Sequence, residues 1–334
     1  MQKNMLSFIK PKVKTLAAIY FYLLVVAVFL VTLLPYWPFS DSLVIAKYAL
    51  LFGPRWWLLI AVVGILFFWR HLSTRQLLLS PILILLSLNF LDFQLPSMTS
   101  YLSSSSKNEI SVLTANIGSG GSVDDVDFIG ARRDLDIILL QEARRIALTE
   151  LFTDYKFKEC VAGLCILSKH PFERIKVLNR KLFQGWGVFA IFYQINTPFG
   201  EVSLANIHFE TPRSVLMGLM YRVFDVGLAK TIESNRQFQA DLVGLWSKNK
   251  PQTLVVGDFN MPEDENIYQR NFSHLHNALG TKGFGFNATK KTAWHSVRID
   301  HVLYSDDFKL KSVGVIEAIN GDHQPVVATF SVGN

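Results

Sequence analysis

Residues 253–260 read Thr253-Leu254-Val255-Val256-Gly257-Asp258-Phe259-Asn260, an apolar run that ends in an aspartate and an asparagine two positions apart. The run has the length and composition of a buried strand. In a continuous strand, residues i and i+2 face the same side, so the Asp258 carboxylate and the Asn260 carboxamide would project together. Asp and Asn also end strands simply because they form turns. Alone, the stretch indicates either a compact polar site or an ordinary turn.

Five further polar signals accompany this stretch, most of them at the end of an apolar run of strand length. The signals are Asn116 after residues 110–115, Glu142 after 137–140, His208 after 202–207, Asp300-His301 before 302–303, and Asp322-His323 before 325–327. Six runs with polar chemistry at their ends predict one shared catalytic edge.

The first hundred residues are dominated by apolar runs. Residues 15–34 form an unbroken apolar stretch of about the length that a helix needs to span a bilayer. Shorter runs follow at residues 56–69 and 77–91, and runs of this length also occur as buried core helices. Trp56, Trp57 and Trp69 stand at run ends, as interfacial aromatic residues do. We therefore predict a membrane anchor over residues 1–98 with about three transmembrane helices.

The basic residues around these runs predict an orientation, because cytoplasmic flanks are enriched in Lys and Arg. Lys3, Lys10, Lys12 and Lys14 precede the first run, Arg70 and Arg75 separate the second from the third, and the intervening loop has only Lys47 and Arg55. The first run is too long for a cleaved signal peptide and no small-residue cleavage site follows it. We expect a multi-pass protein of the bacterial inner membrane, with the N-terminus inside and the C-terminal domain periplasmic or extracellular.

Cys160 and Cys165 are the only two cysteines of the chain. If Ala162-Gly163 forms a two-residue hairpin turn, the two cysteines face each other on neighbouring strands, within reach of a disulfide. A disulfide would suit an oxidising exterior. The alternative is a pair of reduced cysteines packed as small apolar residues.

A Ser-rich linker over residues 99–108 leads into the remaining part, residues 109–334. There we expect a helix over 126–133, capped by Asp124 or Asp125, and another over 234–246. Residues 215–229 are strongly apolar and begin soon after His208. They indicate either a core helix or an apolar lid or membrane-dipping helix beside the active site.

Taken together, the polar motifs resemble the endonuclease/exonuclease/phosphatase superfamily, and the resemblance spans about residues 110–330. It rests on Asn116, Gln141-Glu142, His208, Gly257–Asn260, Arg298–His301 and Gly321–Val326, with a similar strand-and-turn segment at 163–171. The resemblance implies a DNase I-like fold, a four-layered α/β sandwich of two facing β-sheets with helices outside. Here a transmembrane helical region precedes that sandwich, as in the membrane-anchored bacterial branch of the family. Gly321 is a departure, because many members have Ser there.

The resemblance also implies hydrolysis of phosphoester or phosphoanhydride bonds with Mg²⁺ or Mn²⁺, at an active site at one end of the sheets. Glu142 would be the principal metal ligand, with Asn116 and Asp322 assisting. Asp258 would align or deprotonate the attacking water, Asn260 would donate a hydrogen bond to the phosphate, and His208 would stabilise its charge. His323 would act on the scissile phosphate as a base or a cation, with Asp300 fixing its tautomer and raising its pKa.

Three functions remain open at this point. The first is hydrolysis of a lipid-linked phosphate or pyrophosphate, with the lipid bilayer as a partner. The second is a surface nuclease that binds DNA or RNA, for which a basic groove would be needed. The basic residues available for it are Arg213, Arg222, Lys230, Arg236 and Lys290-Lys291. The third is a catalytically silent membrane sensor or scaffold, against which the complete motif set argues. The net charge of +6 does not decide between them, because many of the positive residues flank the membrane runs.

Overall fold

The computed structural model describes residues 2–37, 43–96, 108–118, 129, 134–143, 152–248, 250–292, 295–317 and 321–332, with side chains from residue 12 onward. The chain divides into two compact units, Met1–Phe93 and Gln94–Asn334. This division falls a few residues before the boundary predicted at residue 98. Most of the predicted linker at 99–108, and the predicted helix at 126–133 apart from Ile129, lie outside the described residues.

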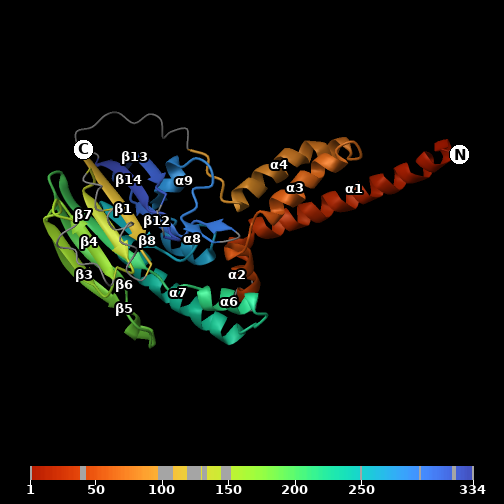
Figure 1. Ribbon diagram of the computed structural model, residues 1–334. Helices are drawn as coiled ribbons and strands as arrows, with labels where there is room; N and C mark the ends of the chain where they lie inside the picture. The colour runs from red at the N-terminus through yellow and green to blue at the C-terminus, as the bar shows by residue number, and fades with distance from the viewer. Residues whose placement is uncertain are drawn as a thin grey trace. The chain divides into compact units, whose positions relative to one another are not determined.

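The first unit is helical (Figure 1). Its elements are α1 (Gln2–Thr32), η1 (Leu34–Tyr36), α2 (Val44–Phe52), α3 (Trp57–Phe68) and α4 (Thr74–Phe90). Within α1, Lys12–Thr32 is long and apolar enough to cross a membrane. The helices α2 and α3 pass the same test only together, and they are bent by 72° at the break between them. By length and composition, the described part of the unit therefore contains one spanning helix, or two if the bent pair counts as one span. The sequence predicted about three.

Polar side chains in this unit bond mainly to nearby backbone. The Arg55 guanidinium donates to the carbonyl oxygens of Leu51 and Phe90, with Nη1 2.8 Å from the Phe90 oxygen. In α4, Ser80 and Ser87 each donate to the carbonyl four residues earlier, at 2.9 Å and 2.7 Å. In a hydrocarbon environment polar groups must find partners inside the protein. These bonds are therefore compatible with a bilayer around the unit.

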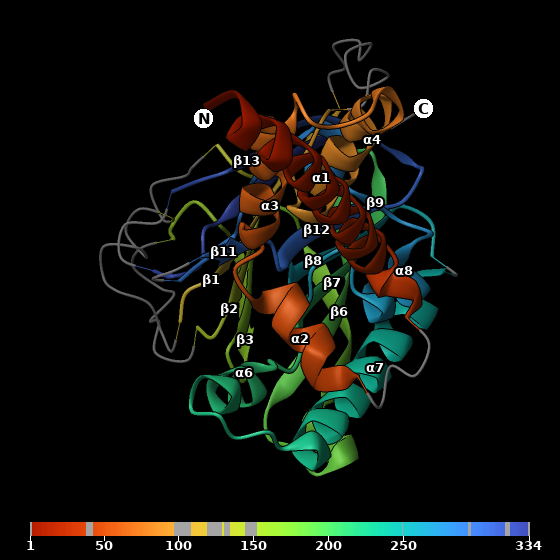
Figure 2. The ribbon, with the colours of Figure 1, turned by 90° about the vertical axis from the view of Figure 1, so that its right-hand side faces the viewer.

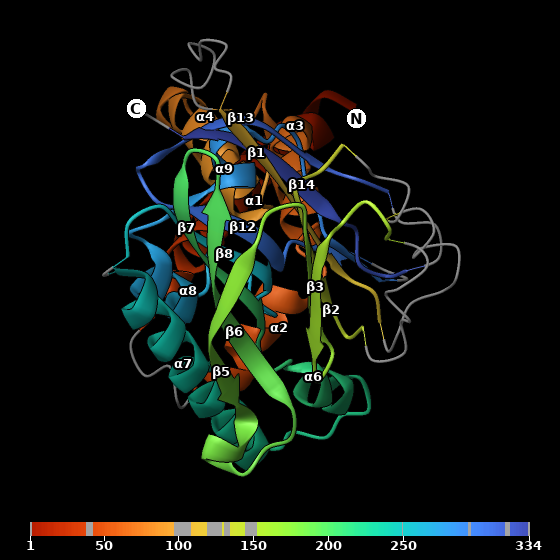
Figure 3. The ribbon, with the colours of Figure 1, turned by 90° about the vertical axis from the view of Figure 1, so that its left-hand side faces the viewer.

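The second unit is built on two six-stranded mixed sheets (Figure 3). The first sheet has the order β13-β14-β1-β2-β4-β3, and the second has the order β5-β6-β7-β8-β12-β9. The strands of the first sheet are β1 (Glu109–Asn116), β2 (Ile137–Gln141), β3 (Phe157–Val161), β4 (Leu164–Ser168), β13 (Phe308–Val315) and β14 (Val326–Val332). Those of the second are β5 (Phe172–Asn179), β6 (Val188–Thr197), β7 (Gly200–His208), β8 (Thr253–Asp258), β9 (His276–Asn277) and β12 (Asp300–Tyr304).

The remaining elements are short strands and helices. They are η3 (Arg180–Phe183), α6 (Arg213–Met220), α7 (Val226–Lys248), α8 (Asn266–Phe272), α9 (Ala278–Lys282), β10 (Lys290–Lys291) and β11 (Ser296–Val297). The helix predicted at 234–246 lies within α7, which is longer at both ends.

Strand alternation explains why the sheets pack face to face. In β1, Ile110 and Val112 enter the core between the two sheets, whereas Leu113 and Ala115 enter a separate core on the outer face. This two-residue period is that of a strand buried on both faces. The outer face of the second sheet packs on α7 and α8 (Figure 2). Two mixed sheets flanked by helices fit the α/β sandwich predicted from the sequence.

Strand direction brings the polar ends together. β1 runs parallel to β2, with Asn116 opposite Gln141, and β7 runs parallel to β8, with His208 opposite Asp258. β12 is antiparallel to β8 and begins with Asp300 opposite Asp258. The six apolar runs singled out in the sequence lie in strands, apart from Pro325 just before β14. Their polar ends lie at one edge, except for the Asp322 carboxylate, which pairs with Lys290 and is 58% exposed.

Residues 215–229 are not a single helix. The helix α6 ends at Met220, and α7 begins at Val226. Met220, Tyr221 and Phe224 are 70%, 74% and 66% exposed. The core-helix interpretation is therefore wrong, because only Val215 and Ala229 of this stretch are buried apolar residues.

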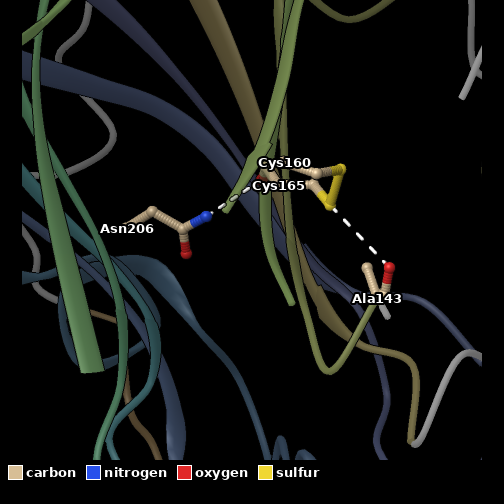
Figure 4. The surroundings of a disulfide bond; sticks show 4 residues. All are labelled: Ala143, Cys160, Cys165 and Asn206. Carbon is tan, nitrogen blue, oxygen red and sulfur yellow. Dashed lines mark hydrogen bonds between the residues drawn. A yellow bond between two sulfur atoms is a disulfide. The ribbon is translucent and has the colours of Figure 1, made fainter. Parts of the chain in front are cut away.

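The two cysteines form a disulfide across the β3–β4 hairpin (Figure 4). Ala162 and Gly163 have φ of 48° and 93°, as a two-residue turn with left-handed backbone requires. Cys160 and Cys165 are direct ladder partners with Cα atoms 4.1 Å apart. The structure thus has the disulfide rather than the reduced alternative.

Candidate active site

Seven of the eight side chains predicted for the site lie at one end of the two sheets. The first sheet and its flanks contribute Asn116, Glu142 and His323, and the second contributes His208, Asp258 and Asp300, with Asn260 two residues beyond β8. Asn116, Asp258, Asn260, Asp300 and His323 are all buried, whereas Glu142 and His208 are partly exposed. The site is therefore shared between the two sheets rather than built on one.

Gly257 allows β8 to deliver Asp258 to this site. Its φ is 143°, and a Cβ atom at this position would lie 2.1 Å from the carbonyl oxygen of Ile207 on β7. Only glycine tolerates that backbone conformation and that close approach. The two strand ends can therefore lie side by side, with Asp258 next to His208.

Asp258 and Asn260 meet through a turn and not through strand alternation. The strand ends at Asp258, and Asn260 has a left-handed φ of 49°. The Asn260 backbone N–H donates to Asp258 Oδ1 at 2.8 Å, and its side-chain Nδ2 lies 3.2 Å from Asp258 Oδ2. The same Nδ2 donates to the carbonyl of Phe209 at 3.0 Å. The predicted pairing is present, but the reason given for it, a continuous strand, was wrong.

Asn116 bridges two carboxylates. Its Nδ2 donates to Asp258 Oδ2 at 2.9 Å and to Glu142 Oε1 at 3.3 Å, and its Oδ1 accepts from the N–H of Gly118 at 3.0 Å. Glu142 also has a left-handed φ, of 57°. Non-glycine residues in this region are uncommon and cost free energy that the surrounding structure must supply. Two of them, Glu142 and Asn260, flank the same polar cluster.

His208 approaches both carboxylates, with Nε2 3.7 Å from Glu142 Oε1 and 3.8 Å from Asp258 Oδ2. Burial lowers the pKa of His208, and the carboxylate of Asp258, which raises it, does not compensate. The positive charge of Arg180 lowers this pKa further. Arg180 also donates to the His208 carbonyl at 2.6 Å. The imidazole of His208 is therefore neutral at pH 7.

His323 is held in the opposite charge state. Its Nδ1 donates to Asp300 Oδ2 at 2.9 Å, and its Nε2 lies 3.9 Å from Asp258 Oδ2. Burial alone would lower the pKa of His323, but the charges of Asp300 and Asp258 and the hydrogen bond to Asp300 raise it to about 9. Burial, and then the charge of Asp300, raise the pKa of Asp258. His323 is thus an imidazolium between two buried carboxylates.

Thr289 joins the segments that carry Asp300 and His323. Its buried Oγ1 accepts from the N–H groups of Ile299 and Asp300 at 3.0 Å and 2.9 Å. Its carbonyl accepts from the N–H of Gln324, next to His323, at 2.6 Å. Nothing in the sequence marked Thr289, because a lone threonine in a loop has no motif around it.

Asp322 is the predicted site residue that the structure does not bring into this group. Its carboxylate forms an ion pair with Lys290 Nζ and is 58% exposed. That ion pair lowers the pKa of Asp322 against the opposing effect of burial. Neighbouring residues of an extended chain face opposite sides, so His323 points into the site and Asp322 points away from it. Its position gives no support to the predicted metal role.

The cluster has the donors that a divalent cation needs. Asp258, Asp300 and His323 offer three ligand atoms that all lie within 4.8 Å of one another, so an acidic and histidine group capable of holding a metal is present. His323 and Asp300 are already engaged with each other as an ion pair. The oxygens of Glu142 and Asp258, bridged by Asn116, are the hard donors that Mg²⁺ and Mn²⁺ prefer. The residues on this side of the cluster fit such an ion.

A second layer of buried charge supports the turn at Asn260. Arg236 of α7 is fully buried and forms two hydrogen bonds to the Glu265 carboxylate, at 2.6 Å and 2.8 Å. Its Nη2 also donates to the carbonyl of Asn260 at 2.6 Å. The sequence placed Arg236 among the residues available to a nucleic-acid groove, and that interpretation is wrong because the side chain has no exposed surface.

Comparisons with known proteins identify the family. The model of the Endonuclease/Exonuclease/phosphatase family matches residues 113–323, well over half of the chain. No curated protein matches the sequence. A solved endonuclease/exonuclease/phosphatase from Beutenbergia cavernae DSM 12333 has a TM-score of 0.51 at 17% identity, covering 68% of this chain and 72% of its own. A humanized D. rerio TDP2 with 14 mutations has a TM-score of 0.50 at 16% identity, covering 67% and 99%. These likenesses show the fold, and with the family match they show that this chain belongs to the Endonuclease/Exonuclease/phosphatase family.

Proposed function

We propose that this chain is a membrane-tethered, divalent-metal-dependent phosphohydrolase or phosphodiesterase that acts outside the cytoplasm on a lipid-linked phosphate or pyrophosphate. Family members generally hydrolyse phosphoester bonds and typically depend on a divalent metal. The observation that carries the proposal is the contact of one carboxylate, Asp258, with a charged His323 and a neutral His208. A general base, a cation and metal-binding oxygens in one cluster are the parts that phosphoryl hydrolysis needs.

Each side chain receives a role in this proposal. Mg²⁺ or Mn²⁺ held by Glu142, with Asn116 positioning it, would stabilise the negative charge of the phosphoryl oxygens. Asp258 would orient the attacking water and accept its proton, and its raised pKa makes it a better base. The imidazolium of His323 would donate to a phosphoryl oxygen through Nε2 while Nδ1 stays on Asp300.

Three assignments are changed or made more specific than the family resemblance implied. Asn260 was expected to donate to the phosphate, but its Nδ2 donates to Asp258 and Phe209. We assign it the task of holding Asp258. His323 was expected to be a base or a cation, and a pKa of about 9 favours the cation at neutral pH. His208, neutral and beside Glu142, would contact a phosphoryl oxygen as an uncharged donor.

Three features support a lipid-linked substrate outside the cytoplasm. The helix α1 is long and apolar enough to span a bilayer. The disulfide of Cys160 and Cys165 suits an oxidising compartment. The argument for a nuclease is weakened, because three of the basic residues available for a nucleic-acid groove are otherwise engaged: Arg236 is buried, and Lys290 and Lys291 pair with acidic residues.

The test is a substrate panel with the purified full chain in detergent. We expect phosphate release from short-chain prenyl pyrophosphates with Mg²⁺ or Mn²⁺, no release with chelator, and intact single- and double-stranded DNA. Glu142→Gln and His323→Gln should each abolish release, whereas His276→Gln, at an exposed histidine paired with Asp306, should not change it. Cleavage of DNA with no phosphate release from the prenyl substrates would instead identify a nuclease and refute the proposal.

A further inference from the structure

The turn between α6 and α7 carries a group of exposed apolar side chains. We define the α6–α7 rim as Met217, Met220, Tyr221, Val223, Phe224 and Val226, all of which are exposed. Two of the six are aromatic, and Tyr221 and Phe224 lie three residues apart within the turn. Water-facing surfaces rarely gather large apolar side chains in this way unless they contact a partner or a membrane.

The rim is a built turn that holds these side chains outward. The N–H of Val223 donates to the carbonyl of Gly218 at 2.8 Å, and Arg222 takes a left-handed φ of 59°. A Cβ atom on Gly218 would lie 3.0 Å from the Val223 carbonyl oxygen, so the glycine permits this close return. Asp225 then caps α7, since its Oδ1 accepts from the N–H of Leu228 at 2.8 Å. These bonds hold the backbone of the turn, from which the rim side chains are exposed.

The charges around the rim are mostly positive. Arg213, Arg222 and Lys230 are exposed at its margins, and the one acidic residue within it, Asp225, accepts the capping hydrogen bond of α7. Basic residues interleaved with aromatic and aliphatic ones suit the boundary between lipid headgroups and acyl chains. Anionic headgroups add attraction for each basic side chain near the surface.

The rim lies within a short length of chain from the candidate active site. The helix α6 begins at Arg213, five residues after His208. Five extended residues and an eight-residue helix together span at most about 30 Å. The His208 end of this connection is anchored, because Arg180 binds its carbonyl and the N–H of Glu210 donates to Gln239 of α7 at 2.9 Å. A lipid surface against the rim would therefore lie within about 30 Å of His208.

We propose that the α6–α7 rim docks on the headgroup region of an anionic bilayer and inserts Tyr221 and Phe224, so that the active site opens at the membrane surface. This docking rests on the membrane anchoring in the proposed function, which keeps the domain near a bilayer. It goes beyond that function because it names a second, peripheral contact of the catalytic domain with lipid. A nucleic acid stacked on the aromatic side chains, or a second copy of the chain, would be a different occupant.

The test places a polarity-sensitive fluorophore on the rim of the full chain in lipid nanodiscs. The probe replaces Phe224 through Phe224→Cys, and the matched control is Lys309→Cys, an exposed position on β13. β13 and α6 lie at opposite ends of the catalytic domain (Figures 2 and 3). We expect the Phe224 probe to shift its emission to the blue, to be quenched by nitroxide-labelled lipid and to lose most of its quenching by iodide. Nanodiscs without anionic lipid should reduce these effects, and the Lys309 probe should show none.

The outcomes separate docking from anchoring. If the chain does not incorporate into nanodiscs, the anchoring in the proposed function fails. If it incorporates and both probes stay equally accessible to iodide, docking alone is refuted. Docking on lipid would also be refuted if the Phe224 probe did not respond to lipid but responded to single-stranded DNA, which would indicate a nucleic acid as the occupant. A response to protein concentration in lipid-free detergent, in place of a response to lipid, would indicate a second copy of the chain.

A second variant connects docking to turnover. Tyr221→Ser/Phe224→Ser should lower hydrolysis of a long-chain substrate embedded in the bilayer by roughly tenfold, because two large apolar side chains no longer bury in lipid. Hydrolysis of a short-chain substrate dissolved in water should stay unchanged. An equal loss on both substrates would mean that these residues only support the fold, and it would refute docking.

Discussion

Arg236 offers a quantitative test of how the site is held. Its guanidinium makes three short hydrogen bonds, two to Glu265 and one to the Asn260 carbonyl, and neither Arg236 nor Glu265 has any exposed surface. Arg236→Met would keep the aliphatic part of the side chain but remove the guanidinium, so the buried Glu265 carboxylate would lose its ion-pair partner. Breaking a buried ion pair in this way costs about 3–5 kcal/mol. That is a large part of the roughly 5–15 kcal/mol by which domains are stable.

A surface ion pair of similar length provides the control for this experiment. Arg174 and Glu159 are 2.8 Å apart, but their side chains are 45% and 27% exposed. Arg174→Met should therefore cost no more than about 1 kcal/mol. The double variant Arg236→Met/Glu265→Leu should cost less than the two single variants added together, because neither member of the Arg236–Glu265 pair is left buried without the other. Glu233, 3.7 Å from Arg236 Nη1, loses that contact in both the single Arg236 variant and the double variant.

Unfolding in urea, read by pulse proteolysis of the full chain in detergent, measures these differences. Activity on a soluble short-chain substrate gives the second readout. Because Arg236 holds the turn that positions Asn260 and Asp258, the fraction of Arg236→Met that stays folded should lose kcat while KM changes little. The reasoning is refuted if Arg236→Met is as stable as Arg174→Met, or if it is destabilised but keeps full kcat in its folded fraction.

Three further predictions concern pH, backbone and disulfide. The pKa of His323 is raised to about 9 in the folded protein, against about 6.5 in the unfolded chain. Protonated His323 therefore stabilises the fold fully below pH 6.5, and this stabilisation is lost as the pH rises through 9. Over this window the free energy of unfolding of the metal-free protein should fall by about 3 kcal/mol. Asp300→Asn should remove most of this pH dependence, as urea unfolding at several pH values would show. Gly257→Ala should lower the free energy of unfolding by at least about 1–3 kcal/mol and abolish activity. Gly314→Ala, where an added Cβ meets open space, should change neither stability nor activity. Equal effects of the two variants would contradict the need for glycine at position 257. Reductant should destabilise the wild type by about 2 kcal/mol and leave Cys160→Ser/Cys165→Ser unaffected; a shift in the double variant would show that the reductant acts elsewhere.

The sequence predicted the polar edge of the two sheets because apolar runs of strand length indicate where the strands lie and where they end. Asn116, His208 and Asp258 each end an apolar run and could be grouped on that basis, and the parallel pairing of β1 with β2 and of β7 with β8 places these ends at one edge. His323 was grouped with them because Asp322-His323 stands just before the apolar run at 325–327, and the resemblance to a family then gave it a role; the residue precedes its strand by three positions. A histidine in a loop gives no periodic signal of its own.

The contacts that hold this edge could not be predicted in the same way. Thr289 and Arg236 lie far in sequence from the groups they bind, and neither stands in a recognisable pattern. Arg236 even carried a misleading signal, because a charged residue on a helix is usually solvated. Its burial depends on Glu265, 29 residues away, and only the fold brings the two together. Asp322 misled in the opposite direction, since its place in a family motif did not fix the direction of its side chain.

In the first unit, composition is not sufficient to predict the helices. Hydropathy gives the apolar stretches but not the breaks between helices, and α2 and α3 are separated by Gly53 and Pro54 with a bend of 72°. Proline has no N–H to continue a helix, so a break at this point has a physical cause. One apolar run can therefore be a candidate span, half of a bent pair or a shorter helix, and among the described helices only α1 is long and apolar enough by itself to cross a membrane.

Two histidines in different charge states lie next to one buried carboxylate, Asp258. Nε2 of His208 and Nε2 of His323 lie 3.8 Å and 3.9 Å from the same Asp258 Oδ2. Burial lowers the pKa of His208 more than the charges of Asp258 and Glu142 raise it, and the Arg180 guanidinium lowers it further. For His323 the charges of Asp300 and Asp258 and the hydrogen bond to Asp300 outweigh burial and raise the pKa. Titratable groups whose surroundings separate their pKa values in this way mark the acid and base positions of many active sites. In the proposed function, phosphate charge would bind at the His323 cation. Asp258, whose two oxygens accept hydrogen bonds from Asn116 and Asn260, would orient the attacking water and accept its proton.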